Sequence, residues 1–490
     1  MIKMTIIQLI ALLPIIILMS GVILIMLIIA WRRIHCLTAI LSIISLLLAF
    51  LALFIVNQFI PVNASMLFFL NKHSIVNISM LLFSGVFACI FGYFWLSNFK
   101  FNQEEFYLLI LFTIIGSILL SIANHMVTVF ISLELICVPM IGLIRYSYSE
   151  EGSLNAVIKY LISSALGTTL ILLGMALIYL SIGDLSFLRI KYFLNTVLFS
   201  KDIIFLCGLA IILFSFALKL SIVPFHIWIF EIYRDTPSIV LIFLSTTVKI
   251  AMFSLLMNFC FHTTLINVQF FIVIVEYMTF LSMIIGNIMA IFQKDVKGII
   301  GLSSIGHIGY LLITIFGIHS YFLTIKTSTL YLIGYLINNI CIFGCIHLVS
   351  NMFVGIDRNN LLVYKGLFWK RPVLAISMLI NLLSLIGFPG TIGFIGKFYL
   401  LILSIKEHLW LLTIGLLIGS IISVYFYFKI IINMFLKKDS VLKNNVKVNV
   451  NTCCIRYIFC ELLILILSSC VIIIGCYPNF FSLFLQYYNY

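Results

Sequence analysis

The chain has 490 residues, of which 64% are hydrophobic and only 9% are charged, and its mean hydropathy is +1.28. This composition excludes a soluble globular domain and predicts an all-α polytopic membrane protein. The formal net charge of +13 comes mainly from loop lysines and arginines, so it indicates membrane topology and contact with anionic lipid, and no nucleic-acid partner is expected. The 12 cysteines show no CxxC spacing, so neither a disulfide framework nor a metal site is expected.

Apolar runs long enough to cross a bilayer follow one another along the whole chain. A helix needs about 20 apolar residues to span the hydrocarbon core. On this basis we predict about 14 transmembrane helices, near residues 5–30, 37–58, 75–97, 106–122, 125–144, 157–182, 203–223, 237–261, 268–292, 299–318, 322–353, 373–404, 408–436 and 457–481.

The loops between these runs predict the orientation, because lysines and arginines are retained on the cytoplasmic side. If the N-terminus faces outward, the cytoplasmic loops carry 17 of these residues and the outer segments carry 7. The even number of helices then places both termini outside. Segments 354–372 and 437–455 become cytoplasmic, and Lys297, at the start of the tenth run, is counted as a loop charge.

The seventh and twelfth runs contain helix-breaking residues within the membrane. Pro224 follows Lys219 in the seventh run, and the twelfth contains "LIGFPGTIGFIGKF", which ends with Lys397 and Phe398. Proline lacks a backbone donor and clashes with the preceding turn, so both helices should break. Breaks at corresponding positions are typical of inverted repeats with an ion pathway at the interruptions, and an offset of five helices inverts the second repeat.

Charged residues inside the predicted spans are candidate functional residues, because each costs roughly 2.5–3.5 kcal/mol to insert. Glu134 lies in the fifth run, and Lys219 and Lys249 in the seventh and eighth are candidate partners. A buried lysine changes its pKa readily and a nearby carboxylate opposes that change, whereas arginine stays protonated. The three residues therefore suit proton transfer, although a carboxylate–lysine pair that only fixes helix packing is the alternative.

Two further candidates lie in the second predicted repeat. Lys397 follows the break in the twelfth run, and His307 in the tenth run titrates near neutrality and could relay protons between lysines. His307 could equally be a satisfied polar group within a helix. Lys429 lies close enough to the cytoplasmic surface to extend its ammonium group into water, and Glu276 has no evident partner.

Several segments, in order, resemble the antiporter-like membrane subunits of respiratory complex I, the NADH-quinone oxidoreductase. The similarity runs from about residue 130 to 430 and is strongest to the bacterial subunit N. The segments are "SLELICVP", "GSLNAVIKYLISSA", "GMALIYLSIGDLSF", "ALKLSIVPFHIW", "TTVKIAMF", "GNIMAIFQKDVKGIIGLSSIGHIGYLL" and "LSLIGFPGTIGFIGKFYLL". Subunit M is expected to carry glutamate in place of Lys397, and subunit L to be longer. Cys137, Met140 and the segment "IFEIYRDTPS" depart from the usual family pattern.

The resemblance implies fourteen helices and two inverted five-helix repeats. The resulting segments are 1–100 (three N-terminal helices), 101–265 and 266–436 (the repeats), and 437–490 (a cytoplasmic loop and the C-terminal helix). It implies that the proton-translocating residues are Glu134, Lys219, Lys249, His307 and Lys397.

The same resemblance implies a place in the bacterial inner membrane beside subunit M and small subunits such as K. NADH, FMN, iron–sulfur clusters and quinone would belong to the assembled complex, since the chain has no phosphate loop, dinucleotide fingerprint or metal-ligand spacing. A monovalent cation/proton antiporter of the Mrp type shares the lysine motifs and is the first alternative. A lipid or drug flippase is the second, and it would require a large amphipathic cavity instead of a row of charges.

Overall fold

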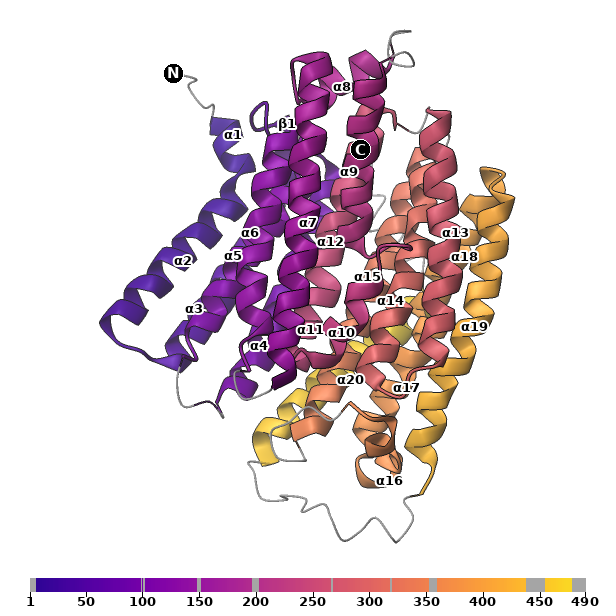
Figure 1. The fold of residues 1–490 in the computed structure, drawn as a ribbon. Helices are drawn as coiled ribbons and strands as arrows, with labels where there is room; N and C mark the ends of the chain where they lie inside the picture. Colours follow the sequence, from indigo (N-terminus) through magenta and orange to yellow (C-terminus); the bar gives the residue numbers. More distant parts are fainter. Residues whose placement is uncertain are drawn as a thin grey trace. The chain divides into compact units, whose positions relative to one another are not determined.

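The computed structural model describes residues 6–97, 99, 102–147, 151–195, 202–265, 268–317, 320–351, 359–437 and 454–477. The predicted cytoplasmic segment 437–455 therefore lies almost wholly outside the described residues. The described residues form mainly helices (Figure 1), with these bounds: α1 Ile6–Ala11, α2 Leu13–Trp31, α3 His35–Val56, α4 Lys72–Leu96, α5 Glu105–Ser121, α6 Met126–Ile144, α7 Glu151–Ile182, α8 Phe187–Leu194, α9 Ile203–Leu220, α10 Ile227–Asp235, α11 Ser238–Phe243, α12 Lys249–Thr263, α13 Gln269–Ile291, α14 Val296–Leu312, α15 Tyr321–Asn351, α16 Leu367–Lys370, α17 Pro372–Ile386, α18 Ile392–Lys406, α19 Trp410–Phe435 and α20 Cys454–Cys476.

Short elements complete the fold. Strands β1 (Val62–Asn63) and β2 (Phe69–Leu70) form an antiparallel pair in which Val62 lies opposite Leu70. Single turns of 3₁₀-helix are Asn57–Phe59, Ile313–Phe316 and Leu361–Tyr364, and Leu244–Val248 is a π-helical turn.

The all-helical polytopic fold predicted from the sequence is confirmed. Among the described residues, 12 helices are long and apolar enough to cross a membrane. Each of the predicted apolar runs coincides with a helix or with consecutive helices, but α5 has only 17 residues, and α17 and α18 have 15 each. The twelfth run falls short because its helix is interrupted, so neither half reaches the length of a continuous span.

The chain divides into two compact units. Unit 1 comprises Met1–Tyr148, Val157–Leu220 and Thr246–Ile272, and unit 2 comprises Ser149–Ala156, Ser221–Ser245 and Val273–Tyr490. In unit 1, α2 to α6 pack on their chain neighbours, and α12 packs on α4, α5, α8 and α9. In unit 2, α15 packs on α11, α17, α18 and α20.

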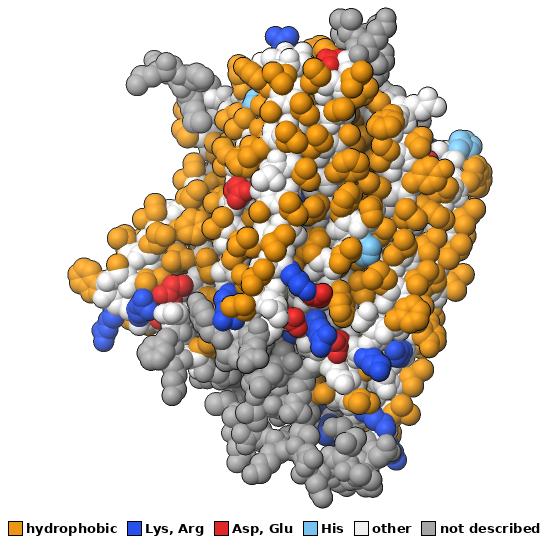
Figure 2. Space-filling view, viewed as in Figure 1, with side chains coloured by type: hydrophobic (Ala, Val, Ile, Leu, Met, Phe, Trp, Pro, Cys, Tyr) orange, Lys and Arg blue, Asp and Glu red, His pale blue; other side chains and the backbone are white. Residues whose placement is uncertain are grey.

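Burial differs strongly between helices. Every residue of α14 is buried, and α14 carries His307. On the face in view, hydrophobic side chains cover much of the surface, and most of the charged side chains lie toward one end of the helices (Figure 2). An apolar flank with a charged end is the pattern of a protein in lipid.

Candidate functional site

The seventh apolar run is interrupted just after Lys219. Helix α9 ends at Leu220, Ser221 has a φ of +59°, and α10 begins only at Ile227. A left-handed residue ends a helix, and Pro224 cannot donate the amide hydrogen bond that would continue it. The interruption therefore places Lys219 in the last turn of α9.

The polar contact of Lys219 is a thiol and not a carboxylate. Its Nζ donates to Sγ of Cys137 at 2.9 Å. Cys137 lies in α6, about one turn beyond Glu134, and the ring of Tyr160 from α7 lies near both residues. Between Glu134 and Lys219 themselves, both of which the structure describes, there is no ion pair within 4.0 Å. Cys137 thus lies close to both members of the predicted pair.

A close helix crossing makes room for the Lys219 side chain. Ser215 Oγ of α9 donates to the carbonyl oxygen of Gly167 in α7 at 2.6 Å. A Cβ atom on Gly167 would lie 2.8 Å from Cε of Lys219. Only glycine leaves space for the lysine at this point of α7.

Lys249 lies in the same unit as Glu134 and Lys219. It is the first residue of α12, directly after the π-helical turn Leu244–Val248, and only 8% of its surface is exposed. A π-turn widens the helix and is often found at functional positions. A lysine so deeply buried inside a membrane protein is costly, which supports a functional role.

The twelfth apolar run is interrupted in unit 2 by a different device. Helix α17 ends at Ile386, Gly387 and Gly390 have φ values of +91° and +85°, and α18 begins at Ile392. A Cβ atom on Gly393 would overlap the carbonyl oxygen of Ser384. Glycines are required here both for the left-handed turn and for the close approach of the two helix ends.

Lys397 reaches back across this interruption. Its Nζ donates to the carbonyl oxygen of Ile386, at the end of α17, at 2.8 Å, and lies 5.2 Å from the ring centre of Tyr310. Its side chain is buried, with 8% of the residue exposed. The ammonium group therefore satisfies a carbonyl that the break leaves without an intrahelical partner, at the end of the helix that favours positive charge.

His307 is held between two tyrosines. Its Nδ1 lies 2.6 Å from the hydroxyl of Tyr331 in α15, and its Nε2 lies 3.1 Å from the hydroxyl of Tyr427 in α19. Hydroxyl groups both donate and accept, so each can exchange hydrogen-bonding roles with the ring nitrogen that it faces. Each ring nitrogen of the imidazole therefore has a hydroxyl partner.

His307 and Lys397 line one cavity of unit 2. Its other lining residues are Tyr331, Gly334, Tyr335, Asn338, Ser384, Leu385 and Gly393. The structure therefore brings together the two second-repeat residues predicted from the sequence. The tyrosines and Asn338 were not predicted, because tyrosine and asparagine occur throughout the chain and carry little signal here.

Helix α20 contacts the turn at the break in the twelfth run. A Cβ atom on Gly475 would lie 2.5 Å from the carbonyl oxygen of Gly390 and 2.5 Å from Cα of Thr391. Glycine at this position lets the backbone of α20 contact the turn between α17 and α18.

Comparison with known proteins assigns the chain to a family. Residues 123–423 match the model of the NADH:quinone oxidoreductase/Mrp antiporter transmembrane region. NADH-quinone oxidoreductase subunit N of Buchnera aphidicola from Acyrthosiphon pisum is 40% identical over 473 residues, 96% of this chain and 97% of the relative. Subunit N of Buchnera aphidicola from Schizaphis graminum is 41% identical over 475 residues, again 96% of this chain and 97% of the relative.

The chain belongs to the NADH:quinone oxidoreductase/Mrp antiporter family, among its subunit N members. The resemblance predicted from the sequence motifs is thereby confirmed.

Solved structures of this antiporter-like family share the fold. Respiratory complex I from Thermus thermophilus with bound aureothin contains a chain with a TM-score of 0.79 and 22% identity, covering 95% of this chain and 97% of that one. The Mrp complex from Dietzia sp. contains a chain with a TM-score of 0.83 and 16% identity, covering 96% and 95%. At such low identity these likenesses show the fold alone.

One prediction about this family member was wrong. Lys297, counted as a loop charge, is 1% exposed, and its Nζ donates to the carbonyl oxygen of Thr236 at 2.8 Å. Helix α14 begins at Val296, and the segment around α10 packs over this first turn. The lysine is buried because α10, distant in sequence, covers it, which the local sequence could not indicate.

Lys429 is partly exposed and contacts two backbone carbonyl oxygens. Its Nζ donates to the carbonyl oxygens of Gln293 at 3.2 Å and Ile291 at 3.5 Å, at the end of α13. A cation at the C-terminus of a helix satisfies its last carbonyls and favours its dipole. The contact fits a packing role for Lys429.

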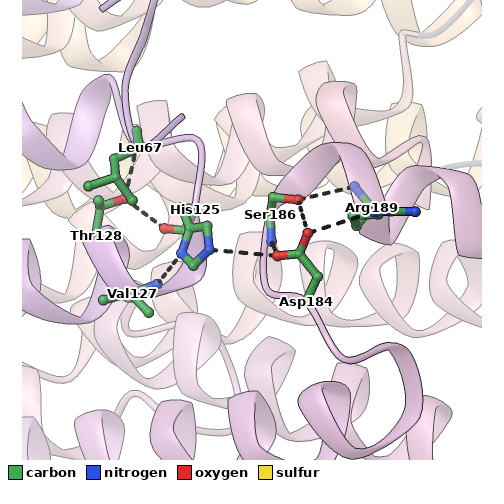
Figure 3. Close-up of polar contacts among 7 residues, drawn as sticks. All are labelled: Leu67, His125, Val127, Thr128, Asp184, Ser186 and Arg189. Carbon is green, nitrogen blue, oxygen red and sulfur yellow. Dashed lines mark hydrogen bonds and ion pairs between the residues drawn. The ribbon is translucent and has the colours of Figure 1, made fainter. Parts of the chain in front are cut away.

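A second polar cluster lies where α6, the helix of Glu134, begins (Figure 3). His125 is the N-cap residue: its Nδ1 accepts from the backbone N–H of Val127 at 3.2 Å, and its Nε2 lies 3.8 Å from Asp184. Asp184 accepts from the amide and the hydroxyl of Ser186 at 3.1 Å and lies 3.8 Å from Arg189.

These contacts set the charges of the cluster. Burial lowers the pKa of His125 below its ordinary value, and the carboxylate of Asp184 opposes this shift only in part. Burial opposes the ionisation of Asp184, but the hydrogen bonds from Ser186 and the nearby imidazole outweigh it and lower the pKa of Asp184. A neutral His125 therefore caps α6 beside an ionised carboxylate.

Proposed function

We propose that the chain acts as a proton-translocating subunit in the membrane arm of an NADH-quinone oxidoreductase, in the place of subunit N. Electron transfer from NADH to quinone, in other subunits, would supply the energy. The observation that carries this function is a lysine at each of two interrupted helices, Lys219 and Lys397, in a chain that is 40% identical to subunit N over almost its full length.

The residues of unit 1 would take up and release the first proton. Lys219 would hold the proton next to Cys137, which lies about one turn from Glu134 in α6. Lysine suits this role because burial favours its neutral form, whereas arginine stays protonated. Lys249, at the start of α12, would relay the charge onward.

The residues of unit 2 would form the second part of the path. His307 exchanges hydrogen bonds with Tyr331 and Tyr427, and the cavity extends from it to Lys397. Lys397 would release its proton on the exit branch. Because its ammonium group also bonds the carbonyl of Ile386, loss of the proton would weaken a contact that joins the two halves of the broken helix.

The architecture proposed for this path is fourteen membrane helices with two inverted five-helix repeats, residues 101–265 and 266–436, after three N-terminal helices and before the C-terminal helix. We place the chain in a bacterial inner membrane with both termini outside, beside subunit M and small subunits such as K. FMN, iron–sulfur clusters and quinone would be held by other subunits. Within the described ranges, no three His, Cys, Asp or Glu residues lie close enough to hold a metal ion.

A cation/proton antiporter of the Mrp type is the alternative that shares the fold. The likeness to the Mrp complex is structural and reaches only 16% identity, whereas the identity to subunit N relatives is 40%. The subunit N assignment is therefore favoured. Sodium-dependent proton movement without NADH would favour the antiporter.

The test is NADH-driven proton pumping in membrane vesicles that carry Lys219→Ala. We expect quinone reduction and pumping to fall together, while NADH oxidation with an artificial acceptor, which reports assembly, stays unchanged. Lys406→Ala, which removes an exposed lysine at the end of α18, is the control and should pump normally. The opposite result would be full NADH-driven pumping in Lys219→Ala together with loss of proton movement driven by a cation gradient. That result would show that the chain is a cation/proton antiporter.

A further inference from the structure

Asn338 is a polar residue in the lining of the unit 2 cavity to which no role has yet been assigned. Asn338 lies in α15, is 1% exposed and lines the cavity together with His307 and Lys397. Its Nδ2 donates to Oγ of Ser384 at 2.9 Å. Its Oδ1 is buried and has no hydrogen-bond partner among the described residues.

Ser384 connects Asn338 to both halves of the broken helix. Ser384 lies in the last turn of α17, and its Oγ also accepts from the backbone N–H of Gly393, in the first turn of α18, at 3.2 Å. Lys397 follows Gly393 by four residues, about one helical turn. Asn338 is therefore connected through Ser384 to the first turn of α18, about one turn before Lys397.

The unpartnered oxygen of Asn338 indicates a bound water. A buried polar atom without a partner is destabilising, and buried polar atoms in proteins nearly always bond either to protein groups or to ordered water. A water molecule needs a polar cavity with two to four partners. Asn338, Ser384, Tyr335 and Lys397 all line this cavity and can supply them.

We propose that Asn338 is a positioning residue for proton transfer between His307 and Lys397. Its amide nitrogen fixes Ser384 at the helix break, and its amide oxygen binds a water molecule in the cavity. This inference rests on the proposed function, because it assigns a role within the same proton path.

The test compares Asn338→Leu with Asn338→Ala in pumping vesicles, with artificial-acceptor activity as the measure of assembly. Leucine fills the space without a polar group, whereas alanine leaves room for a second water. We expect Asn338→Leu to lower pumping roughly tenfold or more, as misplacement of reacting groups does, and Asn338→Ala to retain more. A residue that only packs predicts the opposite order, because the smaller side chain leaves the larger cavity.

Asn339 offers a matched control. It is the next residue of α15 and is also 1% exposed, but its Nδ2 donates to the carbonyl oxygen of Tyr335 and it does not line the cavity. Asn339→Leu should pump normally and keep the pH profile of pumping, whereas Asn338→Leu should shift that profile. Equal effects of the two substitutions would overturn the proposal.

Two further measurements make each outcome decisive. If neither Asn338 variant assembles, Ser384→Ala removes only the hydroxyl: full pumping in that variant overturns the proposal, and a loss with intact assembly supports it. A map of the assembled complex should show water beside Asn338 Oδ1, and a dry cavity would contradict it. Normal pumping in Lys397→Ala would instead refute the proposed path through unit 2 itself.

Discussion

The two interrupted helices hold their lysines in different ways. Lys219 of unit 1 ends a helix that stops at a left-handed serine, and its ammonium group contacts the thiol of Cys137. Lys397 of unit 2 lies in a helix that begins after a glycine turn, and its ammonium group donates to the backbone carbonyl of Ile386. A thiol is a weak acceptor, whereas a carbonyl at a helix end is a strong one.

The difference indicates which lysine is tied to the backbone and which is free to respond to a neighbour. The partner of Lys219 is a side chain, so this contact does not join two segments of backbone. Lys397 stabilises the break itself, so its charge and the geometry of the break depend on each other. Substitutions at Gly393, Gly167 and Cys137 test this contrast, and one at His125 tests a separate site.

The largest expected effect is that of Gly393→Ala in unit 2. The new Cβ atom would overlap the backbone oxygen of Ser384, which cannot move without opening the break. We expect little assembled subunit in the membrane, as measured by native gel and artificial-acceptor activity. Gly167→Ala, whose Cβ atom would meet the flexible side chain of Lys219, should assemble at a cost of about 1–3 kcal/mol and pump less. Equal assembly of the two variants would contradict the expected difference between the break in unit 2 and the helix crossing at Lys219.

A smaller effect is expected at Cys137. Cys137→Val keeps the approximate volume but removes the acceptor for Lys219, so pumping should fall several-fold while assembly is retained. Cys137→Ser keeps a polar atom and should pump nearly as well as the unmodified chain. Cys260→Val, at another buried cysteine of unit 1, is the control. Unchanged pumping in Cys137→Val would show that the Cys137 thiol takes no part in proton translocation.

The smallest expected effect lies at the start of α6. Since burial lowers the pKa of His125, the folded state favours the neutral ring. Its contribution to stability is present above the unfolded value of about 6.5 and is lost as the pH falls through the lower folded value, when Nδ1 no longer accepts from Val127.

His125→Asn keeps a capping acceptor that does not titrate. Heat inactivation of the complex between pH 7 and pH 5 should therefore depend less on pH in this variant, with a difference of about 1 kcal/mol or less. The lowered pKa of Asp184 keeps that carboxylate ionised throughout this range, so it contributes no pH dependence there. If the rate of heat inactivation depended on pH equally in His125→Asn and in the unmodified chain, the titration of His125 would not affect stability.

Much of the fold and part of the site could be predicted from the sequence, because membrane helices are set by local composition. The apolar runs located the helices, and Pro224 and the glycines before Lys397 located the interruptions. Helix α7 begins at Glu151, before its apolar run at 157, because its polar first turns carry no hydrophobic signal.

The contacts between helices could not be predicted. The burial of Lys297 depends on α10, the clamp on His307 depends on Tyr331 and Tyr427, and the wall of the cavity depends on Asn338. Each joins residues that are far apart in the chain and of common types, so no local pattern marks them.

The close contact of α20 with the break has a consequence for biosynthesis. Gly475 lies against the turn that contains Gly390, yet the ribosome makes α17 and α18 well before it. During cotranslational insertion the turn between them remains without this support until α20 enters the membrane. The packing around this turn is therefore completed only late in insertion, after α20 has entered the membrane.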